Sequence, residues 1–233
     1  MSRNKMKTSF LITVFVGLLF AMPDGMVDIQ TINPSIKVKL MYSTEDNFLG
    51  EDVYGDLEKC YLRKEAAIKL SKAQEILQEK KKGYSLLVYD GLRPRDVQAK
   101  MWETVKGTDK QKYVANPRTG SIHNYGAAVD LTILDSLGKP LDMGTHFDYF
   151  GELAQPRYEE KFLAEGKLTE EQVENRKLLR EVMTSAGFQG ISVEWWHFDA
   201  FPKNEVRERY SIVESMKGEK EKSSVSVPDD TTN

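Results

Sequence analysis

Two short stretches of the sequence constrain the fold most strongly, because their polar side chains make chemical sense together only if the fold brings them into contact. The first, Ser-Ile-His-Asn-Tyr-Gly-Ala-Ala-Val-Asp, contains His123 and Asp130. The second, Glu-Trp-Trp-His-Phe, contains His197 and, three residues earlier, Glu194. Two imidazoles and a carboxylate are a typical ligand set for catalytic zinc, which keeps its fourth position for water. We therefore predict one zinc ion per chain, held by His123, Asp130 and His197.

Each stretch also has a less specific interpretation. A histidine followed within ten residues by an aspartate is common in soluble proteins. The second stretch could form a core strand, whose alternation would put Glu194 and His197 on opposite faces unless a bulge or the strand end intervenes. The chain has only three histidines, and two of them fall in these stretches. The third, His146, is expected in a loop near the mouth of the site.

Two further residues fit metal-assisted hydrolysis. A carboxylate beside the metal must accept a proton from the attacking water, and Glu194 is the candidate for this general base. Arg93 follows an Asp-Gly pair and precedes Pro94, which restricts the backbone. A fixed arginine can stabilise the oxyanion that develops during peptide hydrolysis. The alternative is a structural salt bridge to Asp90 or Asp96, and the sequence favours neither.

Composition limits the class of partner. A chain of 233 residues with 40% apolar residues can form one domain with extensions. A formal charge of -3 without a basic block argues against nucleic acid as a partner, and the lack of a glycine-rich phosphate loop argues weakly against nucleotides. Cys60 is the only cysteine, so it cannot form an intramolecular disulfide, and we expect it to be buried. The expected substrate is a small molecule.

The two ends of the chain differ from the middle. Three basic residues precede an uncharged run from Ser9 to Met22, a pattern typical of a secretory signal peptide. A membrane anchor is the alternative, but the run is shorter than the roughly 20 residues that span a bilayer. We predict a signal peptide at residues 1–25, then a domain at residues 26–215 of an exported protein without a stable membrane span. Residues 216–233 have the composition of a disordered tail.

The middle of the chain predicts an α+β fold with a central, mainly antiparallel sheet and flanking helices. Helices and strands alternate irregularly, and several expected strands have one apolar face. Strands are expected within residues 27–43 and at 85–89, 127–133 and 191–199. Helices are expected at residues 62–82, from Pro94 through Val105, and between Thr169 and Gly187. Residues 44–56 and 107–120 are expected to be loops.

The motifs resemble those of one known family, the zinc D-alanyl-D-alanine dipeptidases of the vancomycin-resistance (VanX) type. Three patterns carry the resemblance: Ser-x-His-x-x-Gly-x-Ala-Val-Asp-Leu-Thr at 121–132, Asp-Gly-x-Arg-Pro at 90–94 and Glu-Trp-Trp-His at 194–197. Residues 42–48 and 143–148 agree as well, so the resemblance covers residues 27–205. It implies the small α+β fold shared by hedgehog domains and D-Ala-D-Ala metallopeptidases.

The resemblance also implies an activity, which is hydrolysis of the dipeptide D-alanyl-D-alanine during cell-wall peptide turnover. It places the zinc ligands on His123, Asp130 and His197. It places the general base on Glu194 and the oxyanion-stabilising arginine on Arg93. These implied roles agree with the chemistry inferred from the residues themselves.

The resemblance further implies how the substrate is bound. Asp148 would pair with the free ammonium group, Tyr42 and Ser121 would line the substrate pocket, and Asp90 would support Arg93. A buried carboxylate at Asp148 would be left unpaired by an N-acylated substrate, which explains a preference for free dipeptides.

Two alternatives to a dipeptidase remain open from the sequence. A D,D- or L,D-carboxypeptidase that trims peptidoglycan stem peptides would need an open groove in place of a closed pocket. A zinc-bearing wall-binding module without catalysis would not need a base at Glu194. Many dipeptidases of this type act in the cytoplasm, whereas the predicted signal peptide places this protein in the periplasm or cell envelope.

Overall fold

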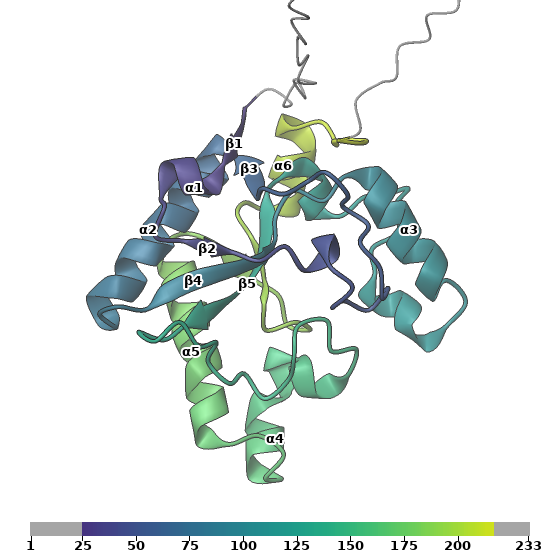
Figure 1. The fold of residues 1–233 in the computed structure, drawn as a ribbon. Coiled ribbons are helices and arrows are strands. Elements are labelled where there is room, and N and C mark those ends of the chain that lie inside the picture. The colour runs from purple at the N-terminus through teal and green to yellow at the C-terminus, as the bar shows by residue number, and fades with distance from the viewer. Residues whose placement is uncertain (1–24, 217–233) are drawn as a thin grey trace, which may run out of the picture. The chain divides into compact units, whose positions relative to one another are not determined.

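The computed structural model describes residues 25–216 and places a five-stranded sheet at their centre (Figure 1). In spatial order the strands are β2 (Lys37–Val38), β4 (Ser85–Asp90), β5 (Ala128–Leu134), β7 (His197–Asp199) and β6 (Gln189–Gly190). Strand β2 runs parallel to β4, and every other neighbouring pair is antiparallel. The predicted α+β fold with a mainly antiparallel sheet is therefore confirmed.

Helices pack against the sheet and contribute part of the core. Helix α2 (Lys64–Lys80) buries a stripe of Ala66, Leu70, Ala73 and Leu77, and it packs against β4 and α5 (Glu170–Ser185). In Figure 1, α2 and α5 lie on one side of the molecule and α3 (Arg95–Val105) on the other. The remaining helices are α1 (Ile29–Ile32), α4 (Glu159–Ala164) and α6 (Lys203–Arg209).

The capping signals in the sequence predicted where helices α5 and α3 begin. Helix α5 begins with a capping box, in which the Gln172 amide donates to the Thr169 hydroxyl at 3.2 Å and the Thr169 amide donates to the Gln172 side chain at 2.9 Å. Helix α3 begins directly after Pro94, whose fixed φ suits the first turn.

Cys60 is buried, as expected.

The predicted strand within residues 27–43 is largely wrong. This segment forms β1 (Met26–Asp28), which pairs with β3 (Tyr61–Arg63), then α1, the two-residue strand β2 and a 3₁₀ helix at Met41–Ser43. The Asn33 side chain accepts a hydrogen bond from the Ser35 amide at 3.1 Å, and the intervening proline cannot continue a ladder. A local turn therefore replaces the long strand.

The last predicted strand is also shorter than expected, because β7 covers only His197–Asp199 and residues 191–196 are irregular. Within residues 25–216, no helix has the length and apolar character needed to cross a membrane. The predicted signal peptide and C-terminal tail lie outside the described residues, except for their boundary residues Gly25 and Met216.

Candidate active site

A one-turn 3₁₀ helix, Ile122–Tyr125, positions the first imidazole. Ser121 caps it: its hydroxyl accepts from the His123 amide at 3.3 Å, while its own amide donates to the Asn124 side chain at 2.6 Å. Gly126 ends the turn at φ 67°, a left-handed conformation that glycine adopts without strain. The local sequence thus fixes the backbone of His123.

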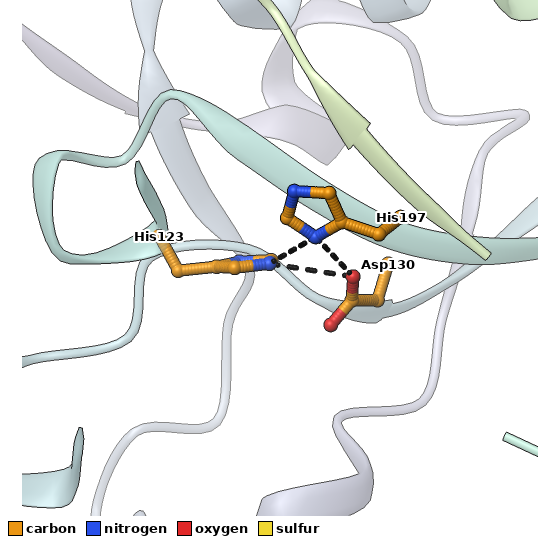
Figure 2. Close-up of side chains that lie close together, drawn as sticks. All are labelled: His123, Asp130 and His197. Atoms are coloured by element: carbon orange, nitrogen blue, oxygen red, sulfur yellow. Dashed lines mark hydrogen bonds and ion pairs between the residues drawn. The ribbon is translucent and has the colours of Figure 1, made fainter. Parts of the chain in front are cut away.

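The other two candidate ligands come from neighbouring strands. Asp130 on β5 and His197 on β7 are directly paired in the antiparallel register, so their side chains lie on the same face. Figure 2 shows the three side chains converging. The His197 Nδ1 lies 3.0 Å from Asp130 Oδ1, and His123 Nε2 lies 3.3 Å from that oxygen and 3.1 Å from His197 Nδ1. Among the described residues, His146 does not belong to this cluster.

Hydrogen bonds on the far side of each ring fix which nitrogen faces the cluster. The His123 Nδ1 donates to the Gly91 carbonyl at 2.8 Å, and the His197 Nε2 donates to Asp199 Oδ1 at 2.9 Å. The other two nitrogens, His123 Nε2 and His197 Nδ1, then carry lone pairs and lie beside the carboxylate oxygen Asp130 Oδ1. Three acceptors this close repel one another unless a metal ion or a proton lies between them, and two imidazoles with one carboxylate form a donor set that fits zinc.

The pKa values of these side chains agree with a cation at this point. Burial lowers the pKa of His197, but its bonds to Asp130 and Asp199 outweigh burial and raise that pKa to about 10. Burial raises the pKa of Asp130, but the two histidines outweigh it and hold that pKa well below its usual range. The cluster therefore favours a bound positive charge.

Replacing Asp199 with asparagine should weaken zinc binding by about 10- to 100-fold, because the side chain would no longer make His197 more basic. The dissociation constant can be measured by competition with a chromophoric chelator. Asp135→Asn, in a turn away from the site, is the control and should bind zinc like the unaltered protein. An Asp199→Asn protein with unchanged affinity would show that Asp199 does not support the metal site.

Arg93 is held rigidly beside the cluster. Its Nε and Nη2 donate to Asp90 Oδ2 at 2.8 and 2.6 Å, and its Nη1 donates to Gln98 Oε1 at 3.0 Å. Its Nη2 also lies 3.4 Å from Asp130 Oδ2. Burial lowers the pKa of Arg93, but Asp90 and other neighbours outweigh it, so the guanidinium stays charged. One Nη1 hydrogen has no partner among the described residues and can serve a substrate.

A β-bulge places Asp90 beneath Arg93. The register between β4 and β5 shifts at Tyr89, which brings Asp90 opposite Asp130. Asp90 Oδ1 accepts hydrogen bonds from the Tyr54 hydroxyl and, at 2.8 Å, from the Gly91 amide. The salt bridge between Asp90 and Arg93 that the sequence allowed is present. It lies within the site, so it is compatible with a role for Arg93 there.

Glu194 lies in the irregular segment before β7, where strand alternation does not apply. It is half-buried and lines the same cavity, of about 380 Å³, as the three candidate ligands and Arg93. Burial raises its pKa to about 6, although the charges of His197 and Arg93 act in the opposite direction. A carboxyl group with a pKa near neutrality can both accept and return a proton.

The predicted substrate contacts lie in this cavity as well. The Tyr42 hydroxyl donates to Asp148 Oδ2 at 2.8 Å, and the Tyr42 ring lies under the Arg93 guanidinium at 5.1 Å. Burial raises the pKa of Asp148 well above its usual value, despite the Tyr42 hydrogen bond. Asp148 also has φ 60°, unusual for a residue other than glycine. Ser121 is half-buried and lines the cavity wall.

Several residues of the site were not predicted from the sequence. Asp199 could have been found, because it lies two residues after His197 and therefore on the same strand face. Gln98, which binds both Arg93 and the Ala115 carbonyl, lies one helical turn into α3 without a distinguishing pattern. Tyr54 comes from an irregular loop, and no local signal points to it.

The chain is similar to known dipeptidases. The family model described as D-ala-D-ala dipeptidase matches residues 22–216. The D-alanyl-D-alanine dipeptidase of Escherichia coli (strain K12) is 37% identical over 174 residues, which are 75% of this chain and 83% of that protein. The protein of the same name from Enterococcus faecium is 32% identical over 192 residues, covering 75% of this chain and 90% of that protein. The chain belongs to the D-Ala-D-Ala dipeptidase family of metallopeptidases.

Proposed function

We propose that the protein hydrolyses D-alanyl-D-alanine to two molecules of D-alanine, using one zinc ion per chain held by His123, Asp130 and His197. Family membership and the similarity to proteins named for this activity support the reaction. The observation that carries the proposal is that one cavity is lined by the metal-ligand cluster, Arg93, Glu194 and Asp148 together.

Each group has a distinct part in the proposed reaction. A zinc ion bound there would supply an acidified water as nucleophile and a Lewis acid for the peptide carbonyl. Glu194 accepts the proton from the attacking water and passes it to the nitrogen of the leaving D-alanine. The unpaired Nη1 hydrogen of Arg93 donates to the carbonyl oxygen as negative charge develops on it. Asp90 and Gln98 hold that guanidinium in place, so it need not reorganise during the reaction.

Asp148 is suited to recognise the free amino group. Its carboxylate is costly to keep charged in the cavity, and the hydrogen bond from Tyr42 compensates only in part. A substrate ammonium would supply the missing positive charge. An N-acylated substrate could not, and it would bury an amide against a carboxylate. This difference is the proposed basis for accepting free dipeptides.

Three aromatic rings, Phe48, Tyr113 and Phe150, bound the cavity and favour a small substrate. The Phe150 ring lies 5.0 Å from Phe48 and stacks at 5.2 Å and 7° on Tyr113. Phe48 and Phe150 come from loops and Tyr113 from the 3₁₀ helix Asp109–Tyr113, and all three rings line the cavity. A carboxypeptidase acting on stem peptides would need a groove open where the rings meet. The arrangement therefore supports the dipeptidase over the carboxypeptidase, and the presence of Glu194 supports catalysis over binding alone.

Replacing Asp148 with asparagine should reduce kcat/KM for free D-Ala-D-Ala by about 100-fold, because an amide cannot compensate the ammonium charge. The N-acetylated dipeptide should be no worse a substrate than before. Release of D-alanine measures both. Asp46→Asn, an exposed aspartate on a neighbouring loop, is the control and should leave both rates unchanged. Equal loss on both substrates would refute ammonium recognition by Asp148.

Export to the periplasm or cell envelope is part of the proposal and is supported by the N-terminal sequence pattern. The substrate would then be dipeptide freed during peptidoglycan turnover. Cell fractionation with N-terminal sequencing of the protein tests this. Recovery of the full-length chain in the cytoplasm would contradict it.

A further inference from the structure

A fully buried arginine lies on helix α5, outside the active site. Arg176 shares its helix face with the buried Leu179 and Val182, where a guanidinium is costly unless its donors are satisfied. Its Nε donates to the Met143 carbonyl at 2.7 Å and its Nη2 to the Leu153 carbonyl at 3.0 Å. The two bonds therefore go to backbone carbonyls ten residues apart in the chain.

These two carbonyls lie at the two ends of one loop, residues 143–153. Helix α5 also binds Asp142, the residue before this loop. The Gln172 Nε2 donates to Asp142 Oδ2 at 2.8 Å, and the Asn175 Nδ2 donates to the Asp142 carbonyl at 2.9 Å. The loop start also packs tightly, since a Cβ on Gly144 would lie 2.4 Å from a Leu168 methyl group. Helix α5 thus ties down both ends of the loop, and Arg176 is the residue that reaches both.

The loop carries two side chains of the cavity wall, Asp148 and Phe150. Asp148 has φ 60°, a conformation that costs free energy in a residue other than glycine and persists only where the surroundings hold it. The Tyr42 hydrogen bond holds the carboxylate, the buried Phe147 ring packs on Trp196, and the bonds from α5 hold the two loop ends.

We infer that Arg176 is a positioning residue: by clamping both ends of loop 143–153 it holds Asp148 where the substrate ammonium must bind, and so sets selectivity for a free amino group. The inference rests on the proposed function. Arg176 touches neither the metal-ligand cluster nor Glu194, so its loss should weaken recognition of the amino group more than the chemical step.

The neighbouring Arg180 offers a matched control. Both arginines face the buried Glu159: Arg180 makes hydrogen bonds of 3.0 and 2.7 Å to its two oxygens, while Arg176 Nη1 lies 3.7 Å away. Among the described residues, Arg180 makes its side-chain hydrogen bonds to Glu159 and none to a carbonyl of the loop. Its replacement removes a positive charge from the same helix and the same ion-pair cluster, but leaves the loop clamp intact.

The test compares Arg176→Gln with Arg180→Gln in the zinc-loaded protein, with rates expressed per bound zinc. Arg176→Gln should raise KM for D-Ala-D-Ala about tenfold, change kcat by less than about threefold, and reduce the preference for the free over the N-acetylated dipeptide about tenfold. Arg180→Gln should leave all three unchanged. A purely structural role would lower the yield of zinc-loaded protein but not its KM or its preference, and that result would overturn the inference.

A second measurement does not depend on turnover. Hydrogen exchange of the amides in residues 144–153 should be faster in Arg176→Gln than in the unaltered protein, and unchanged in Arg180→Gln. If Arg176→Gln does not fold, Arg176→Lys takes its place, because lysine keeps the charge but can reach only one of the carbonyls. Unchanged exchange together with normal turnover would overturn the clamp. Absence of dipeptide cleavage by the unaltered protein would instead overturn the proposed function.

Discussion

Replacing Glu194 with glutamine should lower kcat for D-Ala-D-Ala by about a thousandfold while the protein keeps its fold and its zinc. Glutamine has nearly the same shape, but its amide cannot take a proton from the attacking water. Glu194 is not a member of the metal-ligand cluster, so zinc content should be unchanged. Release of D-alanine at saturating substrate measures the rate, and elemental analysis measures the zinc.

The pH profile of the unaltered protein is the control for this prediction. Glu194 acts as a base only when deprotonated, and burial raises its pKa to about 6. Activity should therefore fall as the pH falls through the pKa of Glu194. A bound zinc ion would shift this fall to a lower pH, because its positive charge stabilises the carboxylate. The residual activity of Glu194→Gln should lack this acid limb. Substantial activity in Glu194→Gln with the limb intact would assign the base to another residue.

Removing zinc with a chelator should reduce turnover by at least about a thousandfold, and adding zinc back should restore it. Without the ion, the cluster has no Lewis acid, and its three acceptors lie within 3.3 Å of one another. Zinc should also raise the melting temperature, because a ligand that binds only the folded state stabilises it. His123→Ala, which removes one proposed ligand, should reproduce the loss of turnover without a chelator.

Magnesium is the control for the chelation experiment. It prefers oxygen ligands in octahedral geometry, whereas this cluster offers two imidazole nitrogens and one carboxylate. Magnesium should therefore not restore activity or raise the melting temperature of the chelated protein. Full activity in protein shown to contain no transition metal would contradict the proposed chemistry.

Local sequence signals predicted the parts of the site that depend on neighbouring residues. The Ser-x-His-x-x-Gly pattern folds as a capped turn because Ser121 and Gly126 supply the cap and the left-handed end. The Asp-Gly-x-Arg-Pro pattern likewise places Arg93 between strand β4 and helix α3, within reach of Asp90. The meeting of His123, Asp130 and His197 needed long-range strand pairing, which the sequence could suggest only through its chemistry.

The sequence identified Glu194 and Asp148 but could not show how irregular backbone positions their side chains. Strand alternation appeared to separate Glu194 from His197, but residues 191–196 do not form a strand, so the conflict does not arise. Asp148 lies on a loop whose conformation is held by contacts with helix α5. In the sequence, no feature distinguishes Arg176 from other helix residues. Its burial and its two carbonyl partners appear only in the folded chain.

The most direct test of the account is kcat/KM of the purified, zinc-loaded protein for free D-Ala-D-Ala and for N-acetyl-D-Ala-D-Ala, measured in parallel by release of D-alanine with Glu194→Gln as the blank. The account predicts turnover of the free dipeptide and, against the acylated one, a discrimination of at least about 100-fold that depends on Asp148. Equal or faster turnover of the acylated peptide would contradict ammonium recognition and identify a carboxypeptidase.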